Sequence, residues 1–553
     1  MEESPVNTTM DKLRADVLEW ITNDPDPASR DELYRLLDGL PDSHEELADR
    51  FSGRLTFGTA GLRGEVRAGP NGMNLAVVRA AAAGLTNWLD RNDATGPVVI
   101  GFDARRGSTQ FAEETARVVT GSGRRALVLP QPLPTPVLAH AVRHHDAAAG
   151  VMVTASHNPP ADNGYKVYLG AQLAGDLGAG SQIVAPVDEQ IEAEIGALGA
   201  LSDIPLGDTG EVLDRGTLDS YLAGVAAVVD PENPKALSIV ATPMHGVGGS
   251  TLVAALEKAG FEAPTMVREQ AEPDPAFPTV AFPNPEEPGA TDHLIALAKS
   301  HGADIALALD PDADRCAVAI DVGGEWRMLS GDELGVLLAD HLMARGVSGT
   351  YATTIVSSSM LRSICAARGV PYAETLTGFK WIARAAADLA FGYEEAIGYC
   401  VAPEHVRDKD GISAALLTCE LAAGLKAQLR GLHDRLDDLA AEFGHYSTGQ
   451  LSVRLDDPIQ IASAMSKVRH SPPATLLDEP VSEITDLAPD TDVITLRTDT
   501  GTRVVVRPSG TEPKLKAYLE VVEPIGNGPA TARERAAASL SALRTEVATA
   551  LGL

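Results

Sequence analysis

The feature that most constrains the fold is a short apolar run that leads directly into a polar loop and then into a helical stretch. Residues 98–100 lead into GFDARRGS, residues 150–153 into ASHNPP and residues 304–309 into DPDADR. The same order returns at residues 237–242, which lead into PMHGVGGS, and again at TYATTIVSS. Continuous apolar strands that alternate with helices are typical of parallel sheets covered by helices on both faces. The chain is therefore predicted to have an α/β fold.

These units group into several predicted domains. Residues 10–40 have the apolar spacing of two short amphipathic helices, interrupted by NDPDPAS. The last hundred residues instead contain alternating strands with a turn at TDTG, followed by an Ala-rich helix. The expected organisation is a helical extension, three similar α/β domains with mixed sheets flanked by helices, and a C-terminal α+β domain, with boundaries at 1–50, 51–215, 216–325, 326–445 and 446–553.

Charge and composition narrow the class of function. The 553 residues include 45 Lys and Arg against 77 Asp and Glu, a net charge of −32, which argues against a nucleic-acid partner. The sequence contains no run of about 18 apolar residues, so no membrane span is expected. The acidic start MEESPVNTTMDKL is unlike a secretory signal. The four cysteines lack zinc-ligand spacing. A cytoplasmic protein without membrane partners is expected, as a monomer or homodimer.

The DPDADR loop is a candidate metal site. Asp310, Asp312 and Asp314 occupy alternate positions between two apolar strands, which suits the oxygen ligands that Mg²⁺ prefers. A calcium EF-hand begins with similar spacing, but its sixth position needs glycine and here holds Arg315. The remaining alternative is a solvated acidic turn, although three close like charges repel unless a cation lies among them.

Two further loops suggest phosphate chemistry. Ser156 follows an apolar strand, so its hydroxyl is expected at the sheet rim where α/β proteins bind ligands; the same residues also fit an ordinary turn. The segment Arg507–Lys514 (RPSGTEPK) combines an arginine, hydroxyls, a glycine and backbone N–H groups, which can cradle an anion. Glu394 and Glu395 follow a strand and could accept hydrogen bonds from sugar hydroxyls.

The motifs TASHNP, DPDADR and RPSGTEPK, in this order, resemble those of the α-D-phosphohexomutase family, the phosphoglucomutases and phosphomannomutases. The resemblance covers roughly residues 55–523. FGTAGLRG and GYEEAIGY look closest to the branch with phosphopentomutase-like members. The resemblance implies three similar α/β domains and a different C-terminal domain around a central cleft.

The resemblance also implies roles for individual residues. Ser156 would be the phosphoserine, and Mg²⁺ would bind an oxygen of its phosphate together with Asp310, Asp312 and Asp314. Arg63, Lys166 and Arg315 would line the reacting phosphate, and His157 and Lys380 are the candidate bases for the substrate hydroxyl. Ala396 stands where much of the family has serine. The implied substrate-binding residues are Arg315, Gly378, Glu394, Ala396, Arg507, Ser509, Gly510, Thr511 and Lys514.

The predicted function is a Mg²⁺-dependent phosphosugar mutase. It would move a phosphoryl group between the 1- and 6-positions of a hexose such as glucose or mannose, through phosphoserine and a bisphosphate intermediate. A sugar 1,6-bisphosphate would be the activator. The alternatives are a phosphopentomutase acting on (deoxy)ribose phosphates, a metal-dependent sugar phosphatase, and a catalytically silent sugar-phosphate sensor. A second phosphate cradle favours a mutase over a phosphatase, which needs only one phosphate site.

Overall fold

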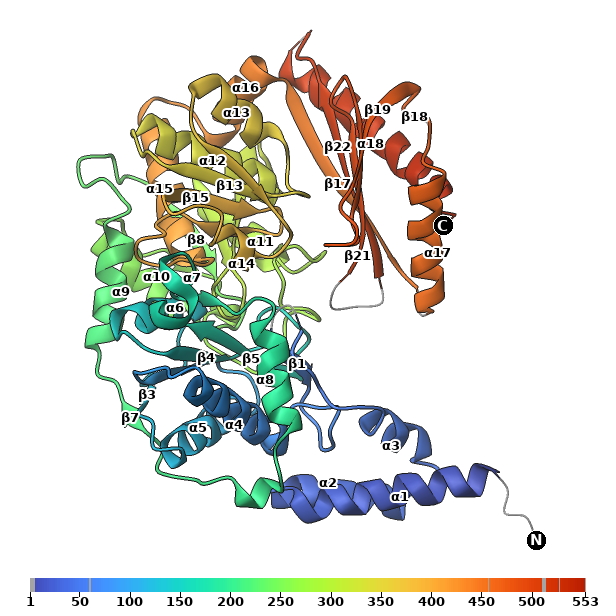
Figure 1. Cartoon of the computed structure of the whole chain (residues 1–553). Helices are drawn as coiled ribbons and strands as arrows, with labels where there is room; N and C mark the ends of the chain where they lie inside the picture. Colours follow the sequence, from blue (N-terminus) through green and yellow to red (C-terminus); the bar gives the residue numbers. More distant parts are fainter. Residues whose placement is uncertain (1–4, 59–60, 456, 510–513, 527, 553) are drawn as a thin grey trace. The chain divides into compact units, whose positions relative to one another are not determined.

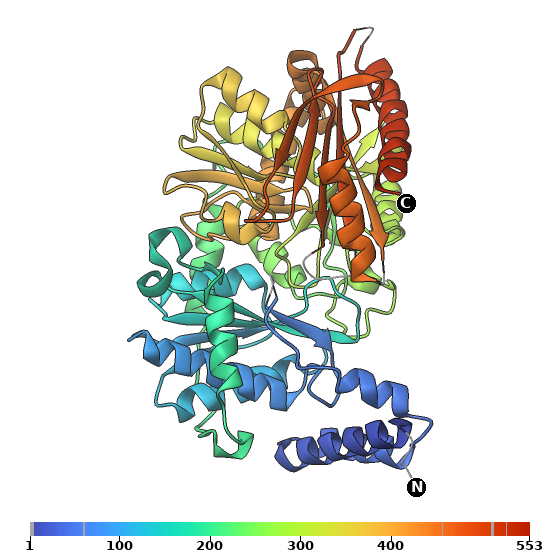
Figure 2. The same ribbon diagram turned by 45° about the vertical axis from the view of Figure 1, so that its right-hand side comes forward.

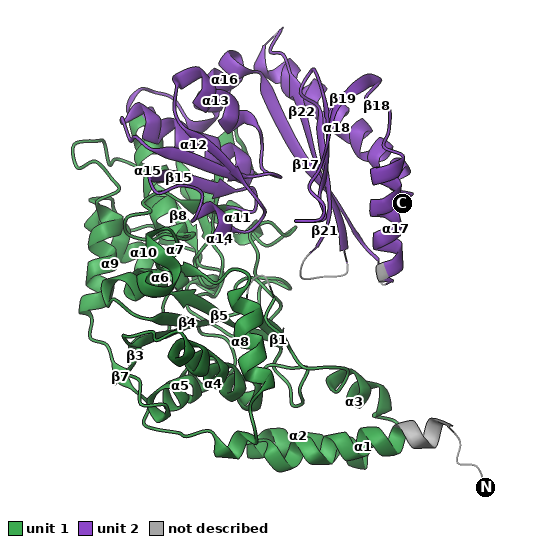
Figure 3. Ribbon diagram, in the orientation of Figure 1, with its two compact units in different colours: residues 1–328, 398–424 green, residues 329–397, 425–553 purple. Residues whose placement is uncertain are grey.

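The computed structural model describes residues 5–58, 61–455, 457–509, 514–526 and 528–552. They form two compact units (Figure 3). Unit 1 comprises residues 1–328 and 398–424, and unit 2 comprises residues 329–397 and 425–553. The predicted central cleft stays a prediction.

Unit 1 begins with helices, as the apolar spacing predicts, and adds a third one. The break at NDPDPAS ends the first helix, and Asp26 caps the second by accepting a hydrogen bond from the backbone N–H of Ala28. Val17, Leu33 and Leu47 form a small core between the helices. The helices are α1 (Pro5–Asn23), α2 (Pro27–Asp38) and α3 (His44–Arg50).

The first sheet has the order β1-β5-β4-β2-β3-β7, with β6 paired to β5. β4 is parallel to β2 but antiparallel to β5, so the sheet is mixed. Helices α4 and α5 cover one face and α6 the other (Figure 1), which explains why β2 and β4 are buried at every position. The strands are β1 (Leu62–Glu65), β2 (Val98–Phe102), β3 (Ala126–Val128), β4 (Ala149–Val153), β5 (Asp162–Leu169), β6 (Ser181–Gln182) and β7 (Glu211–Val212). The helices are α4 (Leu75–Arg91), α5 (Ser108–Gly121), α6 (Thr135–His144), α7 (Ala171–Gly178), α8 (Val187–Gly196) and the 3₁₀ helix η1 (Leu201–Asp203).

The second sheet, also in unit 1, has the order β12-β11-β10-β8-β9. β10 is parallel to β8 and antiparallel to β11, so this sheet is mixed in the same way as the first. The Pro-rich residues 272–289 contain no helix or strand. The strands are β8 (Ile239–Thr242), β9 (Thr265–Met266), β10 (Ile305–Leu309), β11 (Cys316–Val322) and β12 (Glu325–Met328). The helices are α9 (Gly216–Ala226), α10 (Gly248–Lys258), η2 (Arg268–Gln270) and α11 (Asp292–His301).

In unit 2, the parallel strands β14, β13 and β15 lie side by side. The preceding helix α12 starts with a capping box, in which Ser330 and Glu333 each accept from the other's backbone N–H. The strands are β13 (Thr350–Thr354), β14 (Tyr372–Thr375) and β15 (Leu389–Glu394), followed in the chain by β16 (Gly398–Cys400). The helices of unit 2 are α12 (Gly331–Ala344), α13 (Met360–Arg368), α14 (Phe379–Ile382) and α16 (Leu432–Phe443). Strand β16 and all but the last turn of α15 (Gly411–Ala427) belong to unit 1.

The last sheet is antiparallel, in the order β17-β22-β21-β20-β19-β18. Helices α17 and α18 pack on one of its faces (Figure 2), where alternate residues of β21 and β22 join their apolar side chains. This arrangement confirms the predicted C-terminal α+β fold. The elements are β17 (His445–Arg454), α17 (Pro458–His470), β18 (Thr475–Leu476), β19 (Glu479–Asp486), β20 (Ile494–Thr498), β21 (Arg503–Pro508), β22 (Lys514–Glu523) and α18 (Pro529–Leu551).

Candidate active site

Ser156 lies in the loop between β4 and β5, in a strained backbone conformation. Its φ is +51°, a left-handed value that non-glycine residues adopt only when their surroundings impose it. The hydroxyl of Thr154 accepts a hydrogen bond from the Ser156 N–H at 2.9 Å. Ser156 is 1% exposed. The loop therefore holds this hydroxyl in one place, which the predicted role of Ser156 as the phosphoserine would require.

Arg105 is the main anchor of this loop, and the sequence analysis missed it. Its guanidinium donates to the backbone carbonyls of Ser156 and Asn158 at 2.6 Å each, and to those of Pro159 and Asp162 at 2.8 and 3.1 Å. The signal was present, because Arg105 lies in GFDARRGS, a polar loop that directly follows the buried strand β2. The planar guanidinium presents five donors in a fixed fork and here holds four carbonyls, whereas a lysine ammonium has only three donors on a flexible stem.

Arg105→Lys is therefore expected to lower kcat about 100-fold, because a small displacement of a reacting group is costly. Steady-state turnover of a sugar 1-phosphate measures the effect. The matched control is Arg106→Lys, since Arg106 is the adjacent arginine and is exposed. Equal kcat values for the two variants would show that the carbonyl contacts of Arg105 do not position Ser156.

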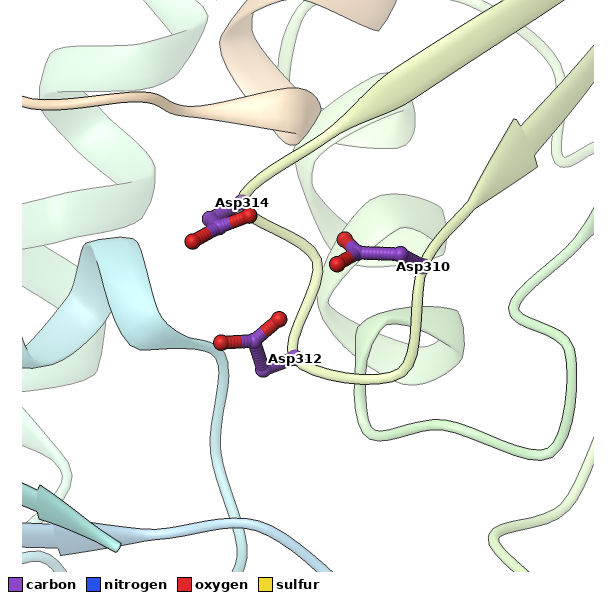
Figure 4. A group of neighbouring side chains, drawn as sticks. All are labelled: Asp310, Asp312 and Asp314. Atoms are coloured by element: carbon purple, nitrogen blue, oxygen red, sulfur yellow. The ribbon is translucent and has the colours of Figure 1, made fainter. Parts of the chain in front are cut away.

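The three aspartates lie together in the loop between β10 and β11 (Figure 4). Their ligand oxygens are within 4.8 Å of one another, and all three side chains are buried. The turn requires a left-handed backbone at Ala313, with φ +56°. It also packs closely on the loop that follows β8, where a Cβ on Gly246 would lie 2.3 Å from the Cα of Pro311. The DPDADR loop thus packs directly against the loop that follows β8, with room for no side chain at Gly246.

Buried cations partly offset the charge of this aspartate triad. Lys166, on β5, places its Nζ 2.8 Å from Asp312 Oδ2 and 3.1 Å from Asp314 Oδ2. Burial opposes ionisation of Asp312, but Lys166 outweighs it and holds the pKa of Asp312 well below its usual range. The Nζ of Lys409 lies 3.5 Å from Asp314 Oδ2. Lys409 was not predicted, and nothing in its local sequence distinguishes it from a surface lysine.

Ser156 reaches the triad directly. Its hydroxyl donates to Asp310 Oδ2 at 2.7 Å and lies 3.2 Å from His157 Nδ1. Burial and the two neighbouring aspartates raise the pKa of Asp310 well above its usual value. Burial, followed by the charges of Arg315 and Arg63, lowers the pKa of His157 well below its usual value. The structure therefore brings together the predicted serine, histidine and aspartates.

The residues of the triad fit a divalent cation. Asp312 Oδ1 and Asp314 Oδ1 are buried and have no hydrogen-bond partner among the described residues. Buried carboxylate oxygens without partners are costly, and an oxygen-preferring cation would satisfy them. Asp310, Asp312 and Asp314 are thus the residues that would hold Mg²⁺.

Two predicted arginines also lie in this part of unit 1. Arg63, on β1, donates to Asn158 Oδ1 at 3.3 Å, and its buried Nε has no hydrogen-bond partner among the described residues. The Nε of Arg315 lies 3.9 Å from Asp314 Oδ1. Together with Lys166 and Lys409, they surround Ser156 and the aspartates with positive charge, which suits a phosphate group.

The predicted sugar-binding residues lie in unit 2. Glu394 ends β15 and is buried. The Oε2 of its neighbour Glu395 accepts from the hydroxyls of Thr354 and Ser357 at 3.2 and 3.1 Å. Ala396 follows these two glutamates and has no side-chain hydrogen-bonding group.

The remaining predicted residues are also in unit 2. Gly378 precedes the short helix α14, and Lys380 is buried within it. Because Ser156 belongs to unit 1, the role of Lys380 as its base stays a prediction. Arg507 and Ser509 lie at the end of β21 and just after it, and Lys514 begins β22. Gly510 and Thr511 lie outside the described residues.

The buried carboxyl of Glu395 predicts a pH effect on stability. Burial, and secondly the charge of Glu394, raise its pKa from 4.5 to about 7. The folded state therefore binds more protons than the unfolded state between these pH values, so stability falls as pH rises through 7. Glu395→Gln removes this loss, about 3 kcal/mol by pH 8.

Unfolding of the full chain, measured from pH 5 to pH 8, compares wild type with Glu395→Gln. We expect the variant to gain stability relative to wild type as the pH rises. The control Glu483→Gln, at an exposed position on β19, should keep the wild-type pH dependence. If the difference in the free energy of unfolding between wild type and Glu395→Gln were the same from pH 5 to pH 8, it would contradict the raised pKa of Glu395.

Within the described residues, no single helix has both the length and the apolar character of a membrane span. In the part of the chain that the structure describes, one bent pair, α15 and α16, passes the same test of length and composition when the two helices are taken together.

The fold and the acidic triad agree with the comparisons with known proteins. Models of the phosphoglucomutase/phosphomannomutase family match its α/β/α domains I, II and III at residues 54–198, 219–323 and 330–443. The model of its C-terminal domain matches residues 465–524. The chain belongs to this family, the α-D-phosphohexomutases.

Individual relatives agree with this assignment. A probable phosphomannomutase of Haemophilus influenzae is 44% identical over 457 residues, which cover 81% of this chain and 93% of the relative. A human phosphopentomutase is 33% identical, with 93% of this chain and 92% of the relative covered. A crystal structure of a phosphoglucomutase/phosphomannomutase family protein from Burkholderia thailandensis shares the fold. It has a TM-score of 0.69 and 18% identity, and covers 89% of this chain and 97% of that chain.

The class of protein follows. The chain is a phosphomutase, an enzyme that acts on small sugar phosphates, as the sequence motifs predict. The family generally uses Mg²⁺, which the aspartate triad could bind.

Proposed function

We propose that the chain interconverts the 1- and 6-phosphates of a hexose through a phosphoserine at Ser156. The observation that carries the proposal is the hydrogen bond of the Ser156 hydroxyl to Asp310, 2.7 Å long, within a buried triad surrounded by cations. The 44% identical relative from Haemophilus influenzae, named a phosphomannomutase, supports a hexose substrate.

The protein's own groups do most of the work, since phosphoryl transfer depends mainly on positioning and charge stabilisation. Arg105 orients the Ser156 loop, while Lys166, Arg63 and Arg315 neutralise the transferring phosphate. His157 is close enough to Ser156 to accept or return a proton. When bound by the three aspartates, Mg²⁺ would stabilise negative charge on the phosphoryl oxygens.

A complete cycle moves two phosphates. Phosphorylated Ser156 donates its phosphoryl group to the free hydroxyl of a sugar monophosphate, breaking the serine O–P bond and giving a bisphosphate. The hydroxyl proton goes to a nearby base, and His157 is our candidate. The bisphosphate then turns over and returns the original phosphate to Ser156. During each half-reaction, Arg507 and Ser509 grip the phosphate that does not react, and Glu394 contacts sugar hydroxyls.

Ribose and deoxyribose phosphates are the competing substrates. Ala396 cannot give the hydroxyl contact that a serine would make, and the human relative named a phosphopentomutase is 33% identical. We favour a hexose because the more similar of these two relatives, 44% identical, is named a phosphomannomutase.

The test compares glucose, mannose, ribose and deoxyribose 1-phosphates side by side, with Mg²⁺ and a trace of glucose 1,6-bisphosphate. We expect the highest kcat/KM for a hexose, with turnover dependent on the bisphosphate. A preference for the pentoses would identify a phosphopentomutase instead. Phosphate release without isomer formation would identify a phosphatase, and binding without turnover would identify a sensor.

A further inference from the structure

A serine-rich loop in unit 2 contacts both the sugar-binding glutamates and the C-terminal sheet. This loop, residues 355–359, joins β13 to α13 and is called here the serine loop. Its Ser357 and Ser358 are 1% and 2% exposed. Buried hydroxyls and backbone groups need partners, and three carboxylates and one arginine supply several of those of the serine loop.

On one side, the serine loop holds the end of β15. Ser357 and the preceding Thr354 donate their hydroxyls to Glu395, and the same two hydroxyls lie 2.9 Å apart. Because Glu394 is the adjacent residue, these bonds restrict where its carboxylate can lie. Sequence reasoning placed Glu394 and Glu395 together but gave no sign that the second one anchors the first.

A buried aspartate strengthens this side of the contact. Asp332 Oδ1 accepts from the Ser358 N–H at 2.6 Å and from the Tyr393 hydroxyl at 3.2 Å. Its Oδ2 accepts from the hydroxyl of Thr448, on β17 of the C-terminal sheet, at 2.9 Å. One carboxylate thus links the serine loop, the end of β15 and the C-terminal sheet.

On the other side, an ion pair of the C-terminal sheet holds the serine loop. Arg503 donates to the carbonyls of Ile355, at 3.2 Å, and Ser357. Glu520 accepts from the backbone N–H and the hydroxyl of Ser359 at 2.8 and 2.6 Å. The two charges lie 3.4 Å apart and are 2% and 1% exposed. Buried and fully bonded, the pair fixes the loop against the sheet.

The same face of the sheet leads to the predicted phosphate-binding residue. Val504 and Val506 of β21 point into the core beneath α17 and α18. Val505 points the opposite way and packs with Val356 of the serine loop. Side chains two residues apart share a face, so Arg507 lies on the face of Arg503, about 13 Å further along the strand. The cross-strand pairs on this face are Arg503–Glu520, Val505–Tyr518 and Arg507–Lys516.

The charges of Glu395 and Arg507 both act on Tyr518, which lies on β22. Burial raises its pKa, the charge of Glu395 raises it further, and Arg507 opposes the rise. The phenol of Tyr518 thus experiences both the sugar-loop carboxylate and the arginine of the phosphate loop.

We infer that the serine loop, clamped by Arg503 and Glu520, is a specificity-determining positioning element that sets the spacing between Glu394 and Arg507. This inference rests on the proposed function, in which Glu394 contacts sugar hydroxyls and Arg507 grips the distant phosphate. The spacing then selects the number of carbons between those groups. A hexose 6-phosphate and a pentose 5-phosphate differ by one carbon.

The test changes the Arg503–Glu520 pair and leaves both Glu394 and Arg507 in place. Arg503→Lys keeps the charge beside Glu520 but cannot hold two carbonyls with a planar fork. Dissociation constants of glucose 6-phosphate and ribose 5-phosphate, measured by calorimetry on the full chain with Mg²⁺, give the size preference. We expect their ratio to move toward unity by about tenfold, because the better ligand depends most on exact spacing. In turnover, KM ratios should follow the dissociation constants, while kcat for the better substrate changes less.

The control is Arg469→Lys, at an arginine of α17 that pairs with Asp486 and Asp492. It should keep the wild-type ratio. If Arg503→Lys keeps the native unfolding midpoint and the wild-type ratio, the inference is overturned. If Arg503→Lys does not fold, Ser359→Ala, which removes one hydroxyl bond to Glu520, decides by the same ratio. Wild-type protein that binds neither sugar phosphate would overturn the proposed function, and this inference with it.

Discussion

Ser156→Ala is expected to lower kcat by about 10⁴-fold or more, because removal of a covalent nucleophile eliminates the reaction path rather than weakening it. The loss should be in kcat, since the hydroxyl is not needed to bind a sugar phosphate. Mass spectrometry of active wild-type protein should find one phosphoryl group on the peptide that contains Ser156, and none on that peptide of the variant.

The matched control is Ser181→Ala, at a buried serine of unit 1 whose hydroxyl donates only to the carbonyl of Gly178 among the described residues. It should keep kcat within a factor of about two, because it loses one neutral hydrogen bond. Ser181 pairs with Leu169, at the end of β5 opposite to the one that the Ser156 loop joins. Full isomerase activity in Ser156→Ala, with no phosphate ever found at that peptide, would refute the phosphoserine mechanism.

Lys166→Met is expected to destabilise the metal-free protein by about 3–5 kcal/mol, because it leaves buried carboxylates without their counter-charge. Lys166 is 1% exposed and bonds to both Asp312 and Asp314. The two aspartates pull the pKa of Lys166 above its usual value although burial opposes this, so the ammonium is charged at neutral pH. Methionine keeps an unbranched side chain, one heavy atom shorter than that of lysine, and removes the ammonium together with its hydrogen bonds to the two aspartates.

Mg²⁺ should stabilise Lys166→Met more than wild type, because the uncompensated carboxylates gain more from a cation. At about 100 times its Kd, a bound ligand adds about 2.7 kcal/mol to stability. Denaturant unfolding with chelator and with Mg²⁺ measures both effects. Lys235→Met is the control, since Lys235 donates to loop carbonyls in the same unit. A variant that unfolds like wild type in chelator, or that gains nothing from Mg²⁺, would contradict this account of the charge balance.

Much of the candidate site was predictable because its parts are local. Ser156 and the three aspartates each follow a buried strand, and a strand end is visible as the point where an apolar run meets polar residues. The aspartate spacing within DPDADR is itself a chemical signal, since alternate carboxylates in a tight turn favour a cation. The same logic correctly predicted helix-covered α/β sheets and the different C-terminal fold. The strand pattern pointed to parallel sheets, whereas β5 and β11 run antiparallel to their neighbours β4 and β10 and make the first two sheets mixed.

The residues that were missed act through distant partners. Arg105 contacts the loop of Ser156 from 51 positions away, and Lys409 reaches Asp314 from the other end of unit 1 in sequence. Arg503 and Glu520 resemble ordinary strand residues until the serine loop covers them. A buried ion pair cannot be distinguished from an exposed one by residue type, because its burial depends on what packs against it.

The sequence by itself determined the fold class, the family and the chemical identity of the reacting groups, because strand periodicity and loop motifs depend on neighbouring residues. Only the tertiary structure decided that Lys166 neutralises Asp312 and Asp314, that Ser156 meets Asp310, and that Glu395 is turned toward hydroxyls. These features arise where strands distant in the chain are brought side by side, and burial there changes the energy of every charge. The local sequence identifies the reacting side chains, and tertiary packing sets the distances between them and their protonation states.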